Sequence, residues 1–396
     1  MSARVDPLTL PPVPPPARAT HPLRDFVLAF VFVVALLLTG LAALKTPAQP
    51  ALEFENRMVT PWPPPKWNAA FTTSFERAFG DRFGARNTLL QAHHLALFYG
   101  FDVSPAANVL LGRDDWLYFL GEDGRSLDRH YRGMLPISDA EIAAVVTELR
   151  RRQKFLAALG IAYVVTIVPE KYTIYPEHLP SWIVRTDRPT PLERLTAAIS
   201  ADGNVRFVDL RAPLLTAKLS RRVYYMTDSH WNMQGAAVAY RAIMQEIESV
   251  LPSGRLLMIA SPALPPYIAG VDMYSGDLAR FVGLPPRYRE ADLAPLSKVL
   301  ANPSARCGKR IDAGTDEGFE IYACDRPSLP RAVMYRDSMA IPLIPLLSEN
   351  FRRIVYVSAR RLDPALILRE KPDVVIEEMV ERSLHAPAAL PMVETR

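Results

Sequence analysis

Residues Ile161 to Val168 read IAYVVTIV. This continuous run of apolar and β-branched residues is typical of a strand that is buried on both faces, as in a parallel sheet covered by helices. Upstream, Ser138 and Glu141 form a capping-box pattern at the start of a predicted helix, and Gly160 ends that helix just before the strand. The stretch therefore predicts an α/β fold.

The alternation of helix and strand continues through most of the remaining chain. Further strands are predicted at residues 205–210, 223–226, 332–336, 354–358 and 373–376, and helices after Thr190, Gly235, Ser338 and Asp363. A Pro-rich region before residue 332 is expected to be irregular. This order predicts a parallel sheet with helices on both faces, whose ligands bind at the carboxyl ends of the strands.

Three residues suited to acyl transfer fall near the ends of predicted strands. Residues 224–235 read YYMTDSHWNMQG and place Asp228 two positions before His230, whereas residues 333–339 read VMYRDSM and place Ser338 just after a strand. A serine becomes a nucleophile when a base takes its proton, and that base needs an acid to fix its tautomer. The sequence thus predicts Ser338 as nucleophile, His230 as base and Asp228 as the orienting acid.

These two pieces resemble the D-x-H-W-N-x-x-G and strand-D-S signatures of the alginate O-acetyltransferase AlgJ/AlgX-like family. Other segments are similar to family motifs in the same order, namely FENRM around Asn56 and Arg57, FGDRFGAR at 79–86, GRDDWLY at 112–118, PEKYTIYPEHLP at 169–180 and GDL at 276–278. Two positions depart from the pattern: Asp115 replaces the usual Gly, and Met339 replaces the Phe that usually follows the serine. Neither change removes a catalytic group.

The resemblance implies a circularly permuted SGNH-hydrolase-like domain, in which the Asp-His motif comes before the serine. It implies transfer of acetyl groups to hydroxyls of an exported polysaccharide, without a cofactor. It also implies a membrane-bound O-acyltransferase partner that passes acetyl across the bilayer.

Several further side chains are candidates for binding substrate or the oxyanion. Trp231, Arg336 and Tyr225 are these candidates, although Trp231 could equally be a core anchor. The backbone N–H groups of Ser338 and its neighbour are expected to face a developing oxyanion, helped by the dipole of the following helix.

Two other functions fit the same residues. An SGNH-type carbohydrate esterase or deacetylase would use the same three groups with water as acceptor. A non-catalytic glycan-binding subunit of a polysaccharide secretion complex would keep the fold only, but the intact trio counts against it.

The N-terminal region predicts a membrane anchor. Residues 26–44 form a run of 19 apolar, uncharged residues, which is long enough to span a bilayer. A cleaved signal peptide is the alternative, but the long Pro-rich segment before the run favours an uncleaved anchor. Because Arg4, Arg18 and Arg24 precede it, the N-terminus is expected in the cytoplasm and the catalytic domain in the periplasm, at the inner membrane.

The predicted organisation has five parts. They are a cytoplasmic Pro-rich tail (1–25), a transmembrane helix (26–44), a Pro-rich linker (45–65), a helical preface packing on the catalytic domain (66–120) and an acetyltransferase domain (121–396). The net charge of +4 is small for this length, and no basic-aromatic interleaving or zinc-type His/Cys spacing occurs, so neither nucleic acid nor a metal is expected. Cys307 and Cys324, the two cysteines, are predicted to form a disulfide in an exported chain.

Overall fold

The computed structural model describes most of the chain. The described residues are 22–45, 51–52, 57–65, 68–83, 86–121, 130–134, 137–252, 273–274, 276–284, 290–291, 307–311 and 319–385. Most of the predicted tail, part of the predicted linker and Asn56 lie outside them. The chain divides into two compact units, Met1–Leu90 and Gln91–Arg396.

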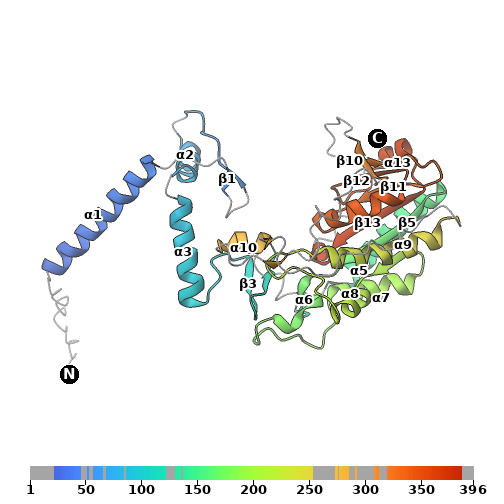
Figure 1. Cartoon of the computed structure of the whole chain (residues 1–396), viewed down its shortest axis with the longest axis horizontal. Helices are drawn as coiled ribbons and strands as arrows, with labels where there is room; N and C mark the ends of the chain where they lie inside the picture. The colour runs from blue at the N-terminus through green and yellow to red at the C-terminus, as the bar shows by residue number, and fades with distance from the viewer. Residues whose placement is uncertain are drawn as a thin grey trace, which may run out of the picture. The chain divides into compact units, whose positions relative to one another are not determined.

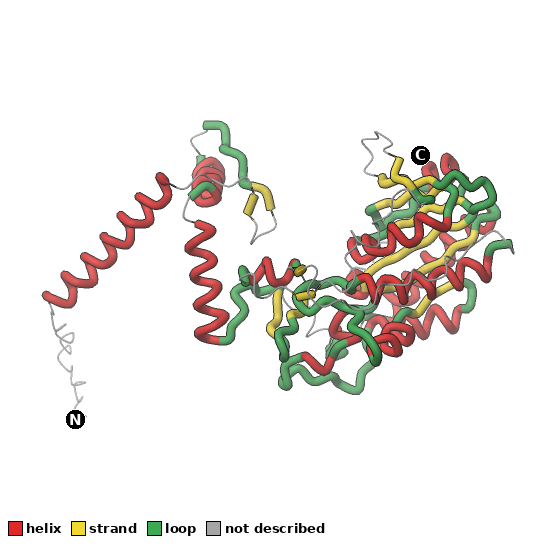
Figure 2. Tube along the Cα trace, viewed as in Figure 1, coloured by secondary structure: helices red, strands yellow, loops and turns green. Residues whose placement is uncertain are grey.

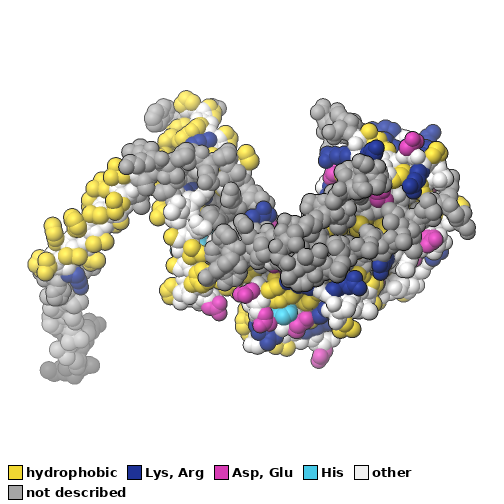
Figure 3. All heavy atoms as spheres, in the orientation of Figure 1, with side chains coloured by type: hydrophobic (Ala, Val, Ile, Leu, Met, Phe, Trp, Pro, Cys, Tyr) yellow, Lys and Arg dark blue, Asp and Glu magenta, His cyan; other side chains and the backbone are white. Residues whose placement is uncertain are grey.

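The first unit is built around helices. Helix α1 covers Pro22–Lys45 and contains the predicted anchor, and its hydrophobic side chains are exposed along its length (Figure 3). None of the helices that the structure describes combines the length and the apolar character that a membrane crossing needs. Strands β1 (Ala51–Leu52) and β2 (Arg57–Met58) pair with each other, and α2 (Ala69–Asp81) begins at the Asn68 cap. Helix α3 (Arg86–Phe101) runs across the boundary between the units.

The second unit contains a 7-stranded sheet with the order β6-β5-β13-β11-β12-β10-β9 (Figures 1 and 2). The bounds of its strands are β5 Ala162–Val168, β6 Arg206–Asp209, β9 Lys309–Ile311, β10 Phe319–Ala323, β11 Arg331–Tyr335, β12 Arg353–Val357 and β13 Val374–Val380. The five strands from β6 to β12 are parallel, as predicted. The carboxyl ends of β5, β13 and β11 therefore lie together at one edge.

Two parts of this architecture differ from the sequence prediction. Strands β9 and β10 add an antiparallel edge in the region expected to be irregular, because β10 pairs antiparallel with both β9 and β12. Conversely, the strand predicted at residues 223–226 is wrong. The structure has only an isolated bridge there, between Tyr224 and Trp231, since the chain turns back on itself.

Helices cover both faces of the sheet, and the alternating side chains of each strand divide between two hydrophobic cores. One face packs against α6 (Lys171–Ile174), α8 (Arg211–Lys218), α9 (Met233–Val250), η5 (Ser338–Leu343) and α12 (Ile344–Leu347). The other packs against α5 (Asp139–Ala158), α7 (Pro191–Asp202) and α13 (Pro364–Glu370). The capping boxes predicted from Ser138–Glu141 and Thr190–Glu193 are both formed at the starts of α5 and α7.

Smaller elements complete the second unit. They are the hairpin of β3 (Val109–Leu111) and β4 (Leu117–Phe119), the pair β7 (Met273–Tyr274) and β8 (Glu290–Ala291), α10 (Asp277–Val282), and the short 3-10 helices η2 (Pro176–His178), η6 (Ser348–Asn350) and η7 (Glu381–His385). The β3–β4 hairpin packs on α10 through Val109, Leu117 and Leu278.

Cys307 and Cys324 are joined by a disulfide, with their Cα atoms 4.7 Å apart. The bond links the residues flanking the β9–β10 pair at the edge of the sheet. Closing a loop of this length stabilises a fold by about 3 kcal/mol in the chain-entropy account. The disulfide therefore fastens a short edge hairpin that few core side chains support.

Candidate active site

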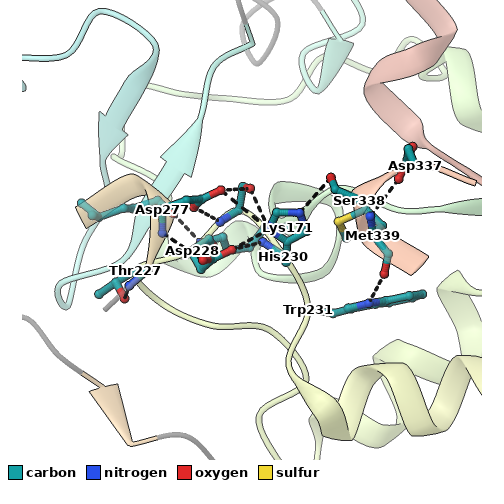
Figure 4. Close-up of polar contacts among 12 residues, drawn as sticks. Lys171, Thr227, Asp228, His230, Trp231, Asp277, Asp337, Ser338 and Met339 are labelled. Atoms are coloured by element: carbon teal, nitrogen blue, oxygen red, sulfur yellow. Dashed lines mark hydrogen bonds and ion pairs between the residues drawn. The ribbon is translucent and has the colours of Figure 1, made fainter. Parts of the chain in front are cut away.

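Ser338, His230 and Asp228 form a continuous chain of hydrogen bonds (Figure 4). The Nε2 atom of His230 lies 2.9 Å from the Ser338 hydroxyl, and its Nδ1 lies 2.6 Å from Asp228 Oδ1. Ser338 is exposed, whereas the Asp228 side chain is 2% exposed. The structure thus brings together the three residues that the sequence selected, from segments more than 100 positions apart, in the order that nucleophilic acyl transfer requires.

The acid and the base sit in a loop that the local sequence folds tightly. The backbone N–H of Asn232 donates to the Val223 carbonyl, and the Asn232 side chain caps α9 by accepting from Gln234 and Gly235. A Cβ on Gly235 would collide with the Val223 carbonyl, so only glycine permits this close approach. These contacts explain the W-N-x-x-G part of the motif: it fixes the loop that carries Asp228 and His230.

The serine follows β11 at the carboxyl edge of the sheet. Asp337, just before it, accepts the N–H of Met339 at 2.9 Å and the N–H of Val380 at 2.8 Å, and so ties the loop to β13. The indole of Trp231 donates to the Met339 carbonyl at 2.8 Å. The residue after the serine is thus a buried anchor point, which explains why an apolar side chain occupies it.

The expected oxyanion arrangement is only partly present. The N–H of Met339 is already bonded to Asp337, so it does not face a ligand as expected. The following helix η5 is a six-residue 3-10 helix with Pro342 inside it, which leaves little helix dipole to help. Within the described part of the chain, the N–H of Ser338 itself has no hydrogen-bond acceptor, and it is the donor that remains for an oxyanion.

The charges around His230 favour its protonated form. Burial lowers the pKa of His230, but the hydrogen bond that its Nδ1 donates to Asp228 and the negative charges of Asp228 and Asp277 outweigh that effect, so the pKa is raised overall. The imidazolium form that arises when His230 takes a proton is therefore stabilised by the protein.

Sequence reasoning missed Lys171, which lies beneath the site. Its ammonium is buried and donates to three backbone carbonyls, those of Leu117 at 2.6 Å, Met226 at 3.0 Å and Asp228 at 2.5 Å. Burial lowers its pKa to about 8, although nearby carboxylates, Asp228 first, oppose that shift. Lys171 thus joins the β3–β4 hairpin to the loop of the acid and base. Its position in the PEKYTIYPEHLP motif was the only available signal.

Replacing Lys171 with methionine should destabilise the fold. Each carbonyl left unpaired in the interior costs about 1–3 kcal/mol, partly offset because no ammonium is buried, so we expect a loss of about 3 kcal/mol at pH 7. Because the folded-state pKa is depressed, the unfolded chain holds more protons between pH 8 and 10.5, and Lys171 makes the parent more stable as pH rises there. Denaturant unfolding should show the deficit of Lys171→Met growing over that range.

The exposed Lys154 provides the control, because Lys154→Met removes the same charge at the surface of α5. Equal stability of the Lys171→Met and Lys154→Met proteins would contradict the assignment.

The structure shows the surroundings of each of the other sequence candidates. Trp231 is fully buried, which fits the core-anchor interpretation. Arg336 pairs its guanidinium with Glu320 of β10. Tyr225 is 8% exposed, and its backbone N–H donates to the His230 carbonyl at 3.3 Å.

Asp115 occupies a left-handed turn. Its φ is +63°, as in the neighbouring Asp114 at +57°, between β3 and β4. Glycine adopts such a φ without strain, and aspartate is among the few other residues that tolerate it. The departure from the family pattern at this position is therefore compatible with the same turn.

Asp228, His230 and Asp277 also offer metal-ligand atoms that lie within 4.8 Å of one another, the one such group among the described residues. Their atoms already satisfy each other: Asp228 accepts from His230, and Asp277 Oδ2 accepts from Ser229 Oγ at 2.6 Å. Hydrogen bonds among the described residues therefore already engage these atoms.

An α/β sheet with a Ser-His-Asp chain at its carboxyl edge fits an SGNH-hydrolase-like domain. The profile of the family described as "SGNH hydrolase-like domain, acetyltransferase AlgX" matches residues 109–308. The "probable alginate O-acetylase AlgJ" of Pseudomonas fluorescens is 30% identical over 306 residues, 72% of each chain. Its counterpart in Pseudomonas syringae pv. tomato is 27% identical over 392 residues, 93% of this chain and 90% of that one.

Solved structures of similar fold include the O-acetyltransferase domain of Pseudomonas putida AlgJ, with a TM-score of 0.42 and 20% identity over 70% of this chain and 92% of that one. Bacillus cereus PatB1 has a TM-score of 0.47 and 17% identity, covering 70% of this chain and 96% of that one. The chain belongs to the AlgJ/AlgX family of SGNH-like acetyltransferases.

Proposed function

We propose that this chain transfers acetyl groups to hydroxyls of an exported polysaccharide through an acyl-Ser338 intermediate. The observation that carries the proposal is the hydrogen-bond chain from Asp228 through His230 to an exposed Ser338 hydroxyl. The names of the relatives make a uronate polysaccharide such as alginate the first acceptor to test.

Each half of the reaction uses the same three groups. His230 Nε2 takes the Ser338 proton while Oγ attacks the acetyl carbonyl, and His230 then returns that proton to the leaving group of the donor. A sugar hydroxyl next gives its proton to His230 and attacks the acyl-serine, and the proton returns to Ser338 Oγ as the new ester leaves. Asp228 holds the tautomer of His230 throughout, and the Ser338 N–H faces the developing oxyanion.

The proposed delivery of acetyl needs a membrane. Acetyl-CoA is cytoplasmic, so an exported active site requires a membrane-bound O-acyltransferase that passes acetyl outward. We propose that the apolar residues 26–44 attach the chain to the inner membrane, with the catalytic domain in the periplasm. The support is the uncharged sequence of the run and the exposed leucine and phenylalanine side chains of α1.

A direct assay separates transfer from hydrolysis. The full-length protein is given a chromogenic acetyl ester with and without alginate or other soluble glycans, and acetyl is measured on the glycan by mass spectrometry and in solution as acetate. Acetyl esters on the glycan support the proposal. Acetate alone, with every glycan offered, would favour the esterase alternative, and no turnover at all would favour a glycan-binding subunit.

Deleting residues 1–50 should separate chemistry from delivery. The shortened chain should keep its rate on small soluble esters, because the active-site contacts lie in the second unit. Glycan acetylation in cells should fall well below that of the full chain, because tethering raises the effective concentration of donor and acceptor. Full acetylation by the untethered chain, or a mature N-terminus near Ala43, would contradict the anchor.

A further inference from the structure

A second carboxylate lies on the side of His230 away from Ser338 (Figure 4). Asp277 begins α10, and its Oδ2 is 3.6 Å from His230 Nδ1. The same carboxylate accepts the backbone N–H of Ser229 at 2.7 Å and the Ser229 hydroxyl at 2.6 Å. Since Ser229 Oγ is itself 3.2 Å from His230 Nδ1, Asp277 reaches the imidazole both directly and through Ser229.

The backbone of Asp277 holds the first carboxylate as well. Its N–H donates to Asp228 Oδ2 at 2.9 Å, while Asp228 Oδ1 accepts from the backbone N–H of His230 at 2.9 Å. Both oxygens of Asp228 are thus fixed, one by the base and one by Asp277. A single residue therefore contacts all three consecutive members of the 228–230 segment.

Glycine makes this approach possible. A Cβ on Gly276 would collide with the Thr227 carbonyl, which also accepts the N–H of Ala279 at 3.1 Å. The N–H of Gly276 lies 3.3 Å from Thr227 Oγ1. The Gly276-Asp277 pair is thus a docking element that needs glycine at its first position and presents a carboxylate at its second.

The charges around His230 come from several elements. Asp228 lies on its own loop and Asp277 on α10, and both raise the pKa of His230, whereas Arg382 of η7 lowers it. Burial lowers the pKa of Lys171, and the negative charges of Asp228, Glu290 and Asp277 oppose that shift. Burial and the charge of Asp228 raise the pKa of Asp277, and the charge of His230 opposes them. Two carboxylates thus share one imidazole.

We propose that Asp277 is a positioning residue for acyl transfer, which holds the Asp228–Ser229–His230 segment in line with Ser338 and adds a second negative charge beside Nδ1. The imidazolium forms whenever His230 takes a proton, first from Ser338 and then from the acceptor hydroxyl. A preorganised negative charge stabilises that form in both half-reactions. The kinetic part of this inference rests on the proposed function, but the effect on the His230 imidazole does not.

The test measures His230 directly in the full-length protein. Parent and Asp277→Asn proteins are labelled with 15N-histidine, the His230 signals are assigned from their loss in His230→Gln, and the imidazole is titrated by NMR. We expect a lower pKa for His230 in Asp277→Asn. Acetyl-ester turnover at the optimum should fall by roughly 10-fold, a part of the about 10²–10⁴-fold that general acid–base catalysis supplies, and the acidic limb should move to lower pH.

Two variants sharpen the result. Ser229→Ala removes the hydroxyl that links Asp277 to His230 but keeps the Asp277 charge. The pKa of His230 should therefore change less than in Asp277→Asn. It also provides the test if Asp277→Asn does not fold, since a pKa equal to the parent's together with unchanged turnover would then overturn the proposal. Asp187→Asn removes the same charge from an exposed turn and should leave the parent values.

An unchanged pKa of His230 in folded Asp277→Asn overturns the proposal, even if turnover falls, because that loss would be merely structural. A parent protein without any turnover would instead refute the proposed function, and the titration would still decide the role of Asp277.

Discussion

Ser338→Ala and His230→Ala should each reduce acetyl-ester turnover by about 10⁴-fold or more while the domain stays folded. The serine supplies the bond-forming oxygen, and His230 Nε2, 2.9 Å from it, supplies the only described base in hydrogen-bond contact with it. Groups that act as one unit lose their contribution together, so the double variant should be no slower than either single variant. Asp228→Ala should cost less, because it orients the base rather than reacting.

The measurement is steady-state turnover of a chromogenic acetyl ester, with circular dichroism to verify folding. Ser249→Ala is the matched control, since Ser249 is exposed and its hydroxyl donates to the Glu246 carbonyl of its own helix. Wild-type turnover by Ser338→Ala would contradict the assignment of Ser338 as the nucleophile.

The pH dependence follows from the same contacts. His230 acts as a base only when neutral, and its pKa is raised above the ordinary value of 6.5 because the Asp228 hydrogen bond and the two carboxylate charges outweigh the effect of burial. Turnover should therefore rise with pH through a midpoint above 6.5.

Arg152→Ala should produce the largest loss of stability of any single substitution considered. Arg152 is fully buried under the sheet and contacts both oxygens of Glu377 at 2.7 Å, while Tyr163 also donates to that carboxylate. Removing one partner leaves a buried charge without compensation, which costs about 3–5 kcal/mol. Denaturant unfolding should show this loss at neutral pH.

The Arg152→Met/Glu377→Leu double variant should recover much of the stability, because it removes both charges and fills the space with apolar atoms. Arg151→Ala is the control. Arg151 is the adjacent arginine of α5, its side chain is 49% exposed and it pairs with Glu148, so it should cost less than about 1 kcal/mol. A loss in Arg152→Ala no greater than in Arg151→Ala would contradict the expected role of the ion pair.

Strands β5, β11, β12 and β13 of the parallel sheet could be predicted because they are buried on both faces. Ile161–Val168 carries apolar or tyrosine residues at every position except Thr166, and residues 332–335 and 354–357 carry only apolar or tyrosine residues. The helix caps at Ser138 and Thr190 could be predicted because their hydrogen bonds join residues within four positions of each other. Strand β10 was missed because only one of its residues is fully buried and because its pairing with β12 joins segments that are distant in sequence.

At residues 223–226 the error was the opposite one, because a strand was predicted where the structure has none. Their apolar pattern resembles a strand, but Trp231 and Asn232 return to Tyr224 and Val223 and close a tight loop. That loop, rather than a strand end, presents Asp228 and His230.

By itself the sequence determined what is local: the buried strands, the helix caps, and the pairing of Asp228 with His230 two residues later, since those contacts form between near neighbours. Only the tertiary structure determined which distant residues contact Asp228 and His230. It placed Ser338 on Nε2 and Asp277 beside Nδ1, and it set Lys171 beneath the loop, because those contacts depend on how β5, β11 and α10 pack. It also made the Met339 N–H unavailable to an oxyanion, because that group donates to Asp337. A motif shows which chemical groups are available. The distances between them depend on how distant segments pack, and the free energy of that packing cannot be read from any single stretch of sequence.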